Sequence, residues 1–158
     1  MNQFYIISRK RFESDFGGEC AYEDIKLPAR ATRGSAGYDF YAPYDFTLAP
    51  GQWTKIPTGI RIVLDDDKFL LIAPRSGLGF KYRLQLDNTV GIIDSDYCRS
   101  DNEGHIFIKI TNDSREGKTL SVKKGDAFAQ GIIMSYFLTA DDDARSVRNG
   151  GMGSTDKR

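Results

Sequence analysis

The chain has 158 residues, a length that suits one domain with a substantial hydrophobic core. Hydrophobic residues make up 40% and charged residues 28%, proportions typical of a soluble globular protein. The 22 basic and 22 acidic residues cancel, which excludes a global field that would draw the chain to nucleic acid or an anionic membrane. Any phosphate binding must therefore come from a local cluster.

Features of exported or membrane proteins are not expected. The apolar run at residues 4–7 is too short for a signal core or a membrane span. Cys20 and Cys98 lie far apart and outside metal-ligand spacing, so two free thiols in a reducing cytosol are predicted. We expect a cytoplasmic location, or the host cytoplasm if the chain is phage-encoded.

The predicted elements, in chain order, are mostly strands. Residues 12–24 are polar and acidic and are expected to be irregular. Residues 53–64 alternate between apolar and polar, and so do 105–110 and 120–122, as in half-buried strands. The continuous apolar runs at 69–73 and 132–134 are consistent with strands buried on both faces, and a short helix is predicted across 78–82.

Turn residues separate these runs at Pro50-Gly51, Asn112-Asp113 and Gly125-Asp126. Many short strands at this spacing predict an all-β jelly-roll or β-barrel domain over residues 1–138. Residues 139–158 have little to bury and are rich in glycine near the end, so a mobile C-terminal arm is expected. His105 is interpreted as a strand residue with no chemical role, because a single histidine cannot build a His-rich metal site.

Five short segments carry the candidate chemistry. They are SAGYDFYA at 35–42, APRSGLGFK at 73–81, NTVGIIDSDY at 88–97, KGDAFAQ at 124–130 and RNGGMGST at 148–155. In this order they resemble the five motifs of the trimeric dUTP pyrophosphatase (dUTPase) family, over residues 27–155, with a bacteriophage or prophage type as one option. The resemblance implies a jelly-roll fold, a homotrimer with shared active sites, and Mg²⁺-assisted hydrolysis of dUTP to dUMP and pyrophosphate, which limits dUTP and supplies dUMP for thymidylate synthesis.

The third segment suggests the catalytic base. Asp94 is a carboxylate that follows an apolar stretch, so it should be held rigidly; an aspartate that caps a turn is the less favoured alternative. The resemblance implies that Asp94 activates the water that attacks the α-phosphorus. It also places Tyr97 against the deoxyribose, where it leaves no room for a 2′-hydroxyl; taken alone, Tyr97 could be a core aromatic.

The same segment suggests how the base is read. Asn88 offers both a donor and an acceptor, which is what the uracil edge requires, although after Asp87 it could also be a turn residue. Backbone groups around Gly91 and Ile93 would complete uracil recognition. Such a pocket would exclude thymine by its 5-methyl group and cytosine by mismatched hydrogen bonds.

The second and fourth segments suggest a phosphate site. Arg75, Ser76 and Gly77 supply a guanidinium, a hydroxyl and an unhindered N–H at one turn, although alone they would suit a solvated surface turn. The resemblance adds Gln130 at the α-phosphate and gives Asp39 a supporting role near the metal water. Mg²⁺ would be held by the phosphates and water, with no direct protein ligand.

The fifth segment suggests a lid, because its glycines allow the chain to wrap around a ligand. The resemblance implies that Arg148, Gly153, Ser154 and Thr155 contact the γ-phosphate. Met152 stands where the family usually has an aromatic ring over the uracil, and a methionine is expected to stack less well.

Two alternatives remain. The polar stretch at residues 98–103 enlarges a hairpin tip beside the third segment and could bind a protein partner, which would give a regulatory protein on a dUTPase scaffold. A dCTP deaminase-type enzyme shares the fold, but the segment at 88–97 looks more like the uracil-reading version. No nucleic acid or membrane partner is expected.

Overall fold

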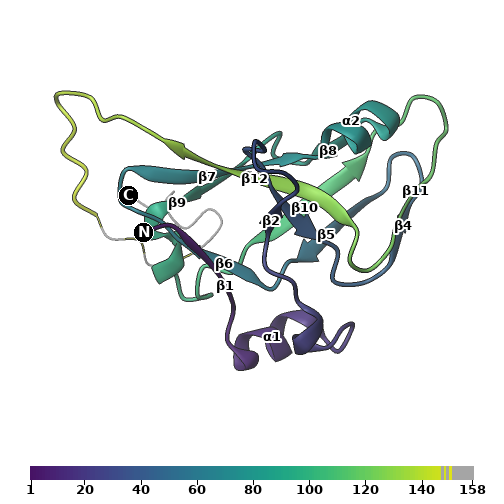
Figure 1. The fold of residues 1–158 in the computed structure, drawn as a ribbon, viewed down its shortest axis with the longest axis horizontal. Helices are drawn as coiled ribbons and strands as arrows, with labels where there is room; N and C mark the ends of the chain where they lie inside the picture. Colours follow the sequence, from purple (N-terminus) through teal and green to yellow (C-terminus); the bar gives the residue numbers. More distant parts are fainter. Residues whose placement is uncertain (147, 149, 151–158) are drawn as a thin grey trace.

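The computed structural model of the chain describes residues 1–146, 148 and 150. Its strands are β1 (Gln3–Ile6), β2 (Ala29–Arg30), β3 (Tyr38–Tyr41), β4 (Phe46–Leu48), β5 (Trp53–Pro57), β6 (Ile60–Val63), β7 (Lys68–Pro74), β8 (Leu84–Leu86), β9 (Gly91–Asp94), β10 (Phe107–Asn112), β11 (Leu120–Val122) and β12 (Ala127–Ser135). The helices are α1 (Arg9–Phe16) and α2 (Ser76–Tyr82), with short 3-10 turns at Tyr22–Asp24 and Ser95–Arg99. The prediction of an all-β fold is confirmed (Figure 1).

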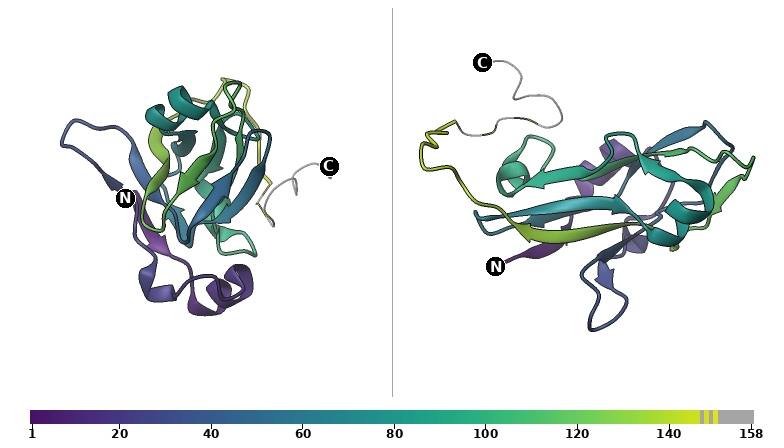
Figure 2. Two further views of the ribbon diagram at one scale, coloured as in Figure 1. Left: turned by 90° about the vertical axis from the view of Figure 1, so that its right-hand side faces the viewer. Right: turned by 90° about the horizontal axis from the view of Figure 1, so that it is seen from above.

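The strands form two main layers. A five-stranded sheet has the order β2-β3-β12-β7-β9, and a three-stranded sheet has the order β5-β10-β8. Two-stranded ribbons pair β1 with β6 and β4 with β11. Figure 2 shows the elongated sandwich that results, with the hairpin between β2 and β3 projecting from one side. Inward-facing side chains of the two sheets form one core.

Alternation along the strands fills that core. On β10, Ile108, Ile110 and Asn112 are buried, and Asn112 is paired because its amide donates to the Leu48 and Lys118 carbonyls at 2.8 and 2.9 Å. This confirms the period of two predicted for 105–110. The predicted short helix at 78–82 is also present, as part of α2.

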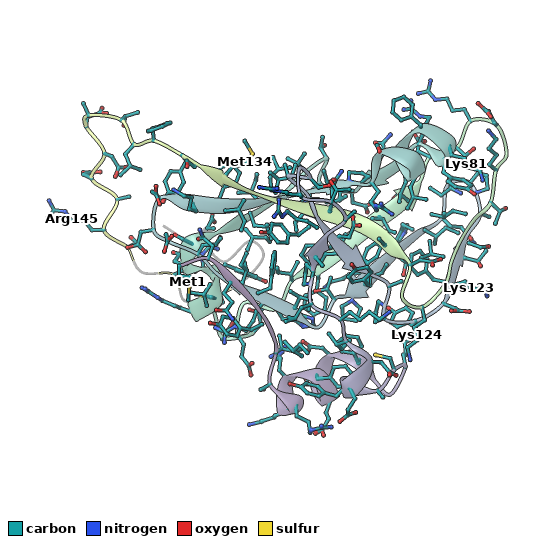
Figure 3. All side chains as sticks on the ribbon, in the orientation of Figure 1. Met1, Lys81, Lys123, Lys124, Met134 and Arg145 are labelled. Carbon is teal, nitrogen blue, oxygen red and sulfur yellow. The ribbon has the colours of Figure 1, made fainter. Side chains whose placement is uncertain are left out.

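The outer face of the large sheet differs from the prediction. Residues 69–73 and 132–134 were expected to be buried on both faces, yet on β7 only Leu70 and Ile72 are buried. Met134 is 42% exposed and points away from the core (Figure 3). Their continuous apolar character therefore lies partly on an outer face that the described residues leave incompletely covered.

The N-terminal region also differs. Residues 12–24 were expected to be irregular, but α1 occupies Arg9–Phe16. Ser8 caps this helix by accepting from the Arg11 N–H at 3.1 Å, and Phe12 and Phe16 are buried beneath it. The pattern was missed because two turns with only two buried apolar positions give a weak helical period.

His105 was interpreted as a strand residue with no chemical role, and its placement in a strand is wrong. It precedes β10 and its side chain is completely buried, with hydrogen bonds to Asp15 and Gly59. Separately, none of the helices in residues 1–146 is long and apolar enough to cross a membrane.

Candidate active site

A cavity of about 610 Å³ opens where β9 meets the three-stranded sheet, within the usual size range of ligand pockets. Its lining includes most of the predicted base, sugar and catalytic residues: Asn88, Gly91, Ile93, Asp94, Tyr97 and Arg148. A second cavity of about 580 Å³ adjoins it and shares Ile92, Asp94 and Arg148. The third segment and part of the fifth are thus brought together.

Asp94 is the last residue of β9, paired in register with Phe69 of β7. Its side chain is half exposed, so water can reach the carboxylate. The Arg148 guanidinium donates to Asp94, and through Nε to Asp96 at 2.8 Å. In this conformation the predicted base is therefore paired with an arginine of the C-terminal segment.

Tyr97 lies in the 3-10 turn that follows β9 and is 8% exposed. Its hydroxyl donates to the His105 carbonyl at 3.0 Å, and the Arg148 guanidinium lies 6.0 Å from its ring centre. The ring is therefore fixed at one end and faces the cavity beside Asp94.

Asn88 lies on the tight connection between β8 and β9, exposed at the cavity edge. Thr89 takes a left-handed conformation there, with φ of 68°. Gly91 begins β9, and a Cβ at this position would come within 2.9 Å of the Ile72 Cβ. Only glycine therefore lets β9 approach β7 this closely while leaving the cavity open.

The sequence analysis missed an ion pair in the cavity wall, formed by Lys109 and Asp87. Lys109 on β10 contacts Asp87 at 2.6 Å and lies 4.1 Å from the Trp53 ring centre. Burial opposes ionisation of Asp87, but hydrogen bonds from Lys109 and Thr111 outweigh it and hold the pKa of Asp87 below its usual value. The alternation along residues 107–111 predicted that Lys109 points away from the core. That this side of β10 lies against the third segment follows only from the register of the strands.

The predicted phosphate residues form a separate cluster. Arg75 Nε lies 3.1 Å from Asp39, whose side chain is 14% exposed. Gln130 pairs in register with both Ala73 and Asp39, and its amide donates to the Pro74 carbonyl at 3.0 Å. Ser76 and Gly77 begin α2 and are exposed.

This phosphate cluster and Asp94 lie at opposite ends of β7. Asp94 pairs with Phe69, whereas Arg75 follows Pro74 at the other end of the strand. Six residues of strand span about 20 Å. That is too far for one α-phosphate to contact the Asp94 carboxylate and the Arg75 guanidinium of the same chain.

The described residues contain no group of three or more His, Cys, Asp or Glu side chains able to hold a metal ion. Arg75, Ser76 and Gly77 nevertheless suit the phosphates of a nucleotide, and Mg²⁺ in such sites is held largely by phosphate oxygens and water. The residues present therefore fit a substrate-carried ion. Met152, Gly153, Ser154 and Thr155 lie outside the described residues.

The stretch at 98–103 is bound closely to the core. Arg61 donates to the Cys98 carbonyl at 3.0 Å, and Ser100 is buried and donates to the Gly150 carbonyl at 3.2 Å. Asn102 donates to the Tyr97 hydroxyl at 2.9 Å. The role of residues 98–103 as a binding site for a protein partner stays a prediction.

Comparisons with known proteins agree on one family. The dUTPase family model matches residues 23–156. The deoxyuridine 5′-triphosphate nucleotidohydrolase of Lactococcus lactis is 40% identical over 135 residues, covering 83% of this chain and 88% of that protein. The Hahella chejuensis enzyme of the same name is 41% identical over 140 residues, covering 84% and 88%.

Solved structures give the same result. The Streptococcus mutans dUTPase matches with a TM-score of 0.67 and 30% identity, covering 86% of this chain and 97% of that one. A dUTPase from phage phi11 of S. aureus matches with a TM-score of 0.67 at 20% identity, covering 92% and 97%, and so supports the fold alone.

The fold and cavity define a class of protein: a β-sandwich that presents an aspartate, an asparagine and an aromatic ring in one nucleotide-sized pocket. Within that class, the matched motifs and relatives show that the chain belongs to the dUTPase family. The resemblance found in the sequence is thereby confirmed.

Proposed function

We propose that this dUTPase hydrolyses dUTP to dUMP and pyrophosphate with Asp94 as the general base. The observation that supports this most strongly is the cavity in which Asp94, Asn88 and Tyr97 meet. Asp94 accepts a proton from a water molecule, the water oxygen bonds to the α-phosphorus, and the bond to the bridging oxygen of the β-phosphate breaks. The leaving group is pyrophosphate.

The other cavity residues orient the nucleotide. Asn88 and the backbone around Gly91 and Ile93 face the uracil, and the Tyr97 ring lies against the deoxyribose. Mg²⁺ held by the substrate phosphates and water would neutralise the phosphate oxygens and so favour charge build-up on the leaving pyrophosphate. Arg148 must leave Asp94 before the carboxylate can accept a proton, and it then contributes its charge at the γ-phosphate.

We infer that the complete site requires a homotrimer. About 20 Å of β7 separates Asp94 from Arg75 in one chain, so the phosphate cluster of a neighbouring chain must complete each site. The exposed apolar residues Met134 and Ile92 on the large sheet are consistent with a covered face. Residues 139–158 then act as the arm that closes over a site.

The product fits a role in nucleotide metabolism. Removing dUTP limits its availability to polymerases, and dUMP feeds thymidylate synthesis. We place this activity in the cytoplasm, or in the host cytoplasm for a phage-encoded chain.

Pyrophosphate release with Mg²⁺ tests the proposal, with dUTP compared against dTTP, dCTP and UTP. Release from dUTP is expected to be far faster than release from the other three nucleotides, because the pocket rejects the 5-methyl group, the cytosine amine and the 2′-hydroxyl by separate contacts. Equal release from all four nucleotides would contradict the assignment of Asn88 and Tyr97. Absence of release from any of them would refute hydrolysis itself.

A further inference from the structure

The N-terminal segment lies outside the family match, which begins at residue 23. Helix α1 lies below the sheets in Figure 1. Phe12 and Phe16 stack at 4.2 Å between ring centres, and the Tyr22 hydroxyl donates to the Ile7 carbonyl at 2.8 Å. The segment is therefore an ordered part of the domain, and its contacts reach Glu103 and His105, which follow the turn that carries Tyr97.

His105 is the link between α1 and that turn. Its Nε2 accepts from the Gly59 N–H at 2.9 Å, so the imidazole proton must be on Nδ1. Nδ1 therefore donates to the Asp15 carboxylate of α1, at 2.6 Å. The Arg11 guanidinium donates two hydrogen bonds of 2.8 Å to the same carboxylate, and these bonds orient the carboxylate toward the imidazole.

The backbone of His105 holds Tyr97. Its carbonyl accepts from the Tyr97 hydroxyl at 3.0 Å, and Asn102 donates to the same hydroxyl at 2.9 Å. The chain between them is tightly folded: Gly104 has φ of 74°, and a Cβ there would come within 2.6 Å of the Cys98 Cα. Movement of His105 therefore moves the hydroxyl anchor of Tyr97.

A second contact ties the loop between Tyr97 and His105 to the start of α1. The Ser8 N–H and hydroxyl donate to the two carboxylate oxygens of Glu103, at 2.9 and 2.6 Å. Glu103 itself is left-handed, with φ of 62°, a conformation that needs support from outside the turn. Ser8 also caps α1, so one residue couples the helix start to the turn.

We propose that Asp15 and Ser8 are positioning residues for sugar selection: through His105 and Glu103 they hold the Tyr97 ring where it excludes a ribose 2′-hydroxyl. This inference rests on the proposed function, because it assumes that Tyr97 faces the sugar. The physical reason is that steric exclusion of one hydroxyl depends on the position of the ring to within about 1 Å. The N-terminal segment is thus a specificity element, rather than only an extra layer over the core.

Substitutions at the two contacts test the proposal through the ratio of kcat/KM for dUTP to kcat/KM for UTP. Asp15→Ala removes the acceptor of His105 Nδ1 and is expected to lower that ratio about 10-fold. Ser8→Ala removes the hydroxyl bond to Glu103 and the cap bond from the Arg11 N–H, both at the surface, and is expected to lower the ratio about 3-fold. Glu13→Ala, at an exposed position of α1, is the matched control and should leave the ratio unchanged.

Tyr97→Phe provides a second measurement, because it keeps the ring and removes the hydroxyl anchor. It should lower the ratio as Asp15→Ala does, and the double variant should be little worse than either single variant. Additive effects would contradict the proposal, since they would show that the two residues act independently.

Hydrogen exchange at the amides of residues 103–105 gives a readout that does not depend on activity. In Asp15→Ala and Ser8→Ala the Glu103 and His105 amides, which bond to Ser100 and Asn102 carbonyls, should exchange faster than in Glu13→Ala. A lower melting temperature with an unchanged dUTP to UTP ratio would overturn the proposal and leave α1 a structural role. Wild-type inactivity on both nucleotides would instead refute the proposed function, and the exchange measurement would still decide whether α1 holds the turn.

Discussion

The two halves of the candidate site differ in how complete they are within one chain. The half at Asp94 is a concave cavity whose base, sugar and catalytic residues already converge. The half at Arg75 lies on the open surface, where Ser76 and Gly77 are exposed. Under the proposed function, recognition of the nucleoside is therefore built into one chain, whereas binding of its phosphates requires a neighbouring chain.

The largest effect is expected from Asp94→Asn, which alters the complete half. The amide keeps the shape of the carboxylate but cannot accept the proton, so turnover should fall about 10²–10⁴-fold while dUTP binding changes little. Single-turnover assays and nucleotide titration measure the two quantities. Asp96→Asn, which changes the other carboxylate paired with Arg148, is the control and should retain most of the turnover. Parallel loss of binding and turnover in Asp94→Asn would remove its assignment as the base.

Deletion of residues 148–158 tests the part of the chain that should bridge the two halves. Loss of the Arg148 charge and the predicted lid should lower turnover about 100-fold, because one set of transition-state contacts is lost. The melting temperature should stay close to that of the intact chain. Arg145→Ala, at an exposed position just outside the deletion, is the control. Full activity in the truncated chain would exclude a lid function.

Gly91→Ala should narrow the cavity at Asp94 and leave the cluster at Arg75 unchanged. The added Cβ would press on Ile72, so stability should fall by about 1–3 kcal/mol and the KM for dUTP should rise. Ile62→Val, in the core of β6, should cost about 1 kcal/mol without changing KM. Urea unfolding and steady-state kinetics separate the two effects, and equal KM values in both variants would show that Gly91 does not shape the pocket.

The smallest effect is expected in how the free energy of unfolding depends on pH, through the contact between His105 and Asp15 of α1. Burial lowers the pKa of His105 below 6.5, although the bond to Asp15 opposes that shift. The unfolded chain then binds more protons than the folded one just below pH 6.5, so stability falls as the pH drops through this window. Urea midpoints between pH 7.5 and 5 should show this slope, and His105→Gln should flatten it. An identical slope in both proteins would assign the effect to other groups.

The sequence predicted the complete half better than the open one. Asn88, Gly91, Asp94 and Tyr97 fall within ten consecutive residues, so the connection before β9, the short strand β9 and the 3-10 turn after it place them close together. Lys109 was missed because its approach to Asp87 depends on the register of β10 with β8. No local pattern encodes such a register between distant strands.

The open half shows a different limit. The residue types of Arg75, Ser76 and Gln130 predicted a phosphate site, and the structure does cluster Arg75, Gln130 and Asp39. Their distance from Asp94 could not be predicted, because it depends on which end of β7 each segment pairs with. His105 and α1 were misjudged for a related reason, since Asp15 lies 90 residues from its partner.

Subunit complementation tests whether each active site combines residues of two chains. Asp94→Asn and Arg75→Ala are each expected to be nearly inactive alone, but co-assembled at equal amounts they should regain about a quarter of wild-type activity. Each site takes Asp94 from one chain and Arg75 from another. In an equal mixture, either residue is intact with a probability of about one in two, so both are intact in about a quarter of the sites. Mixing the two preformed assemblies without subunit exchange provides the background. Recovery near a quarter would support the shared site, whereas no recovery in verified mixed assemblies would show that one chain supplies both halves.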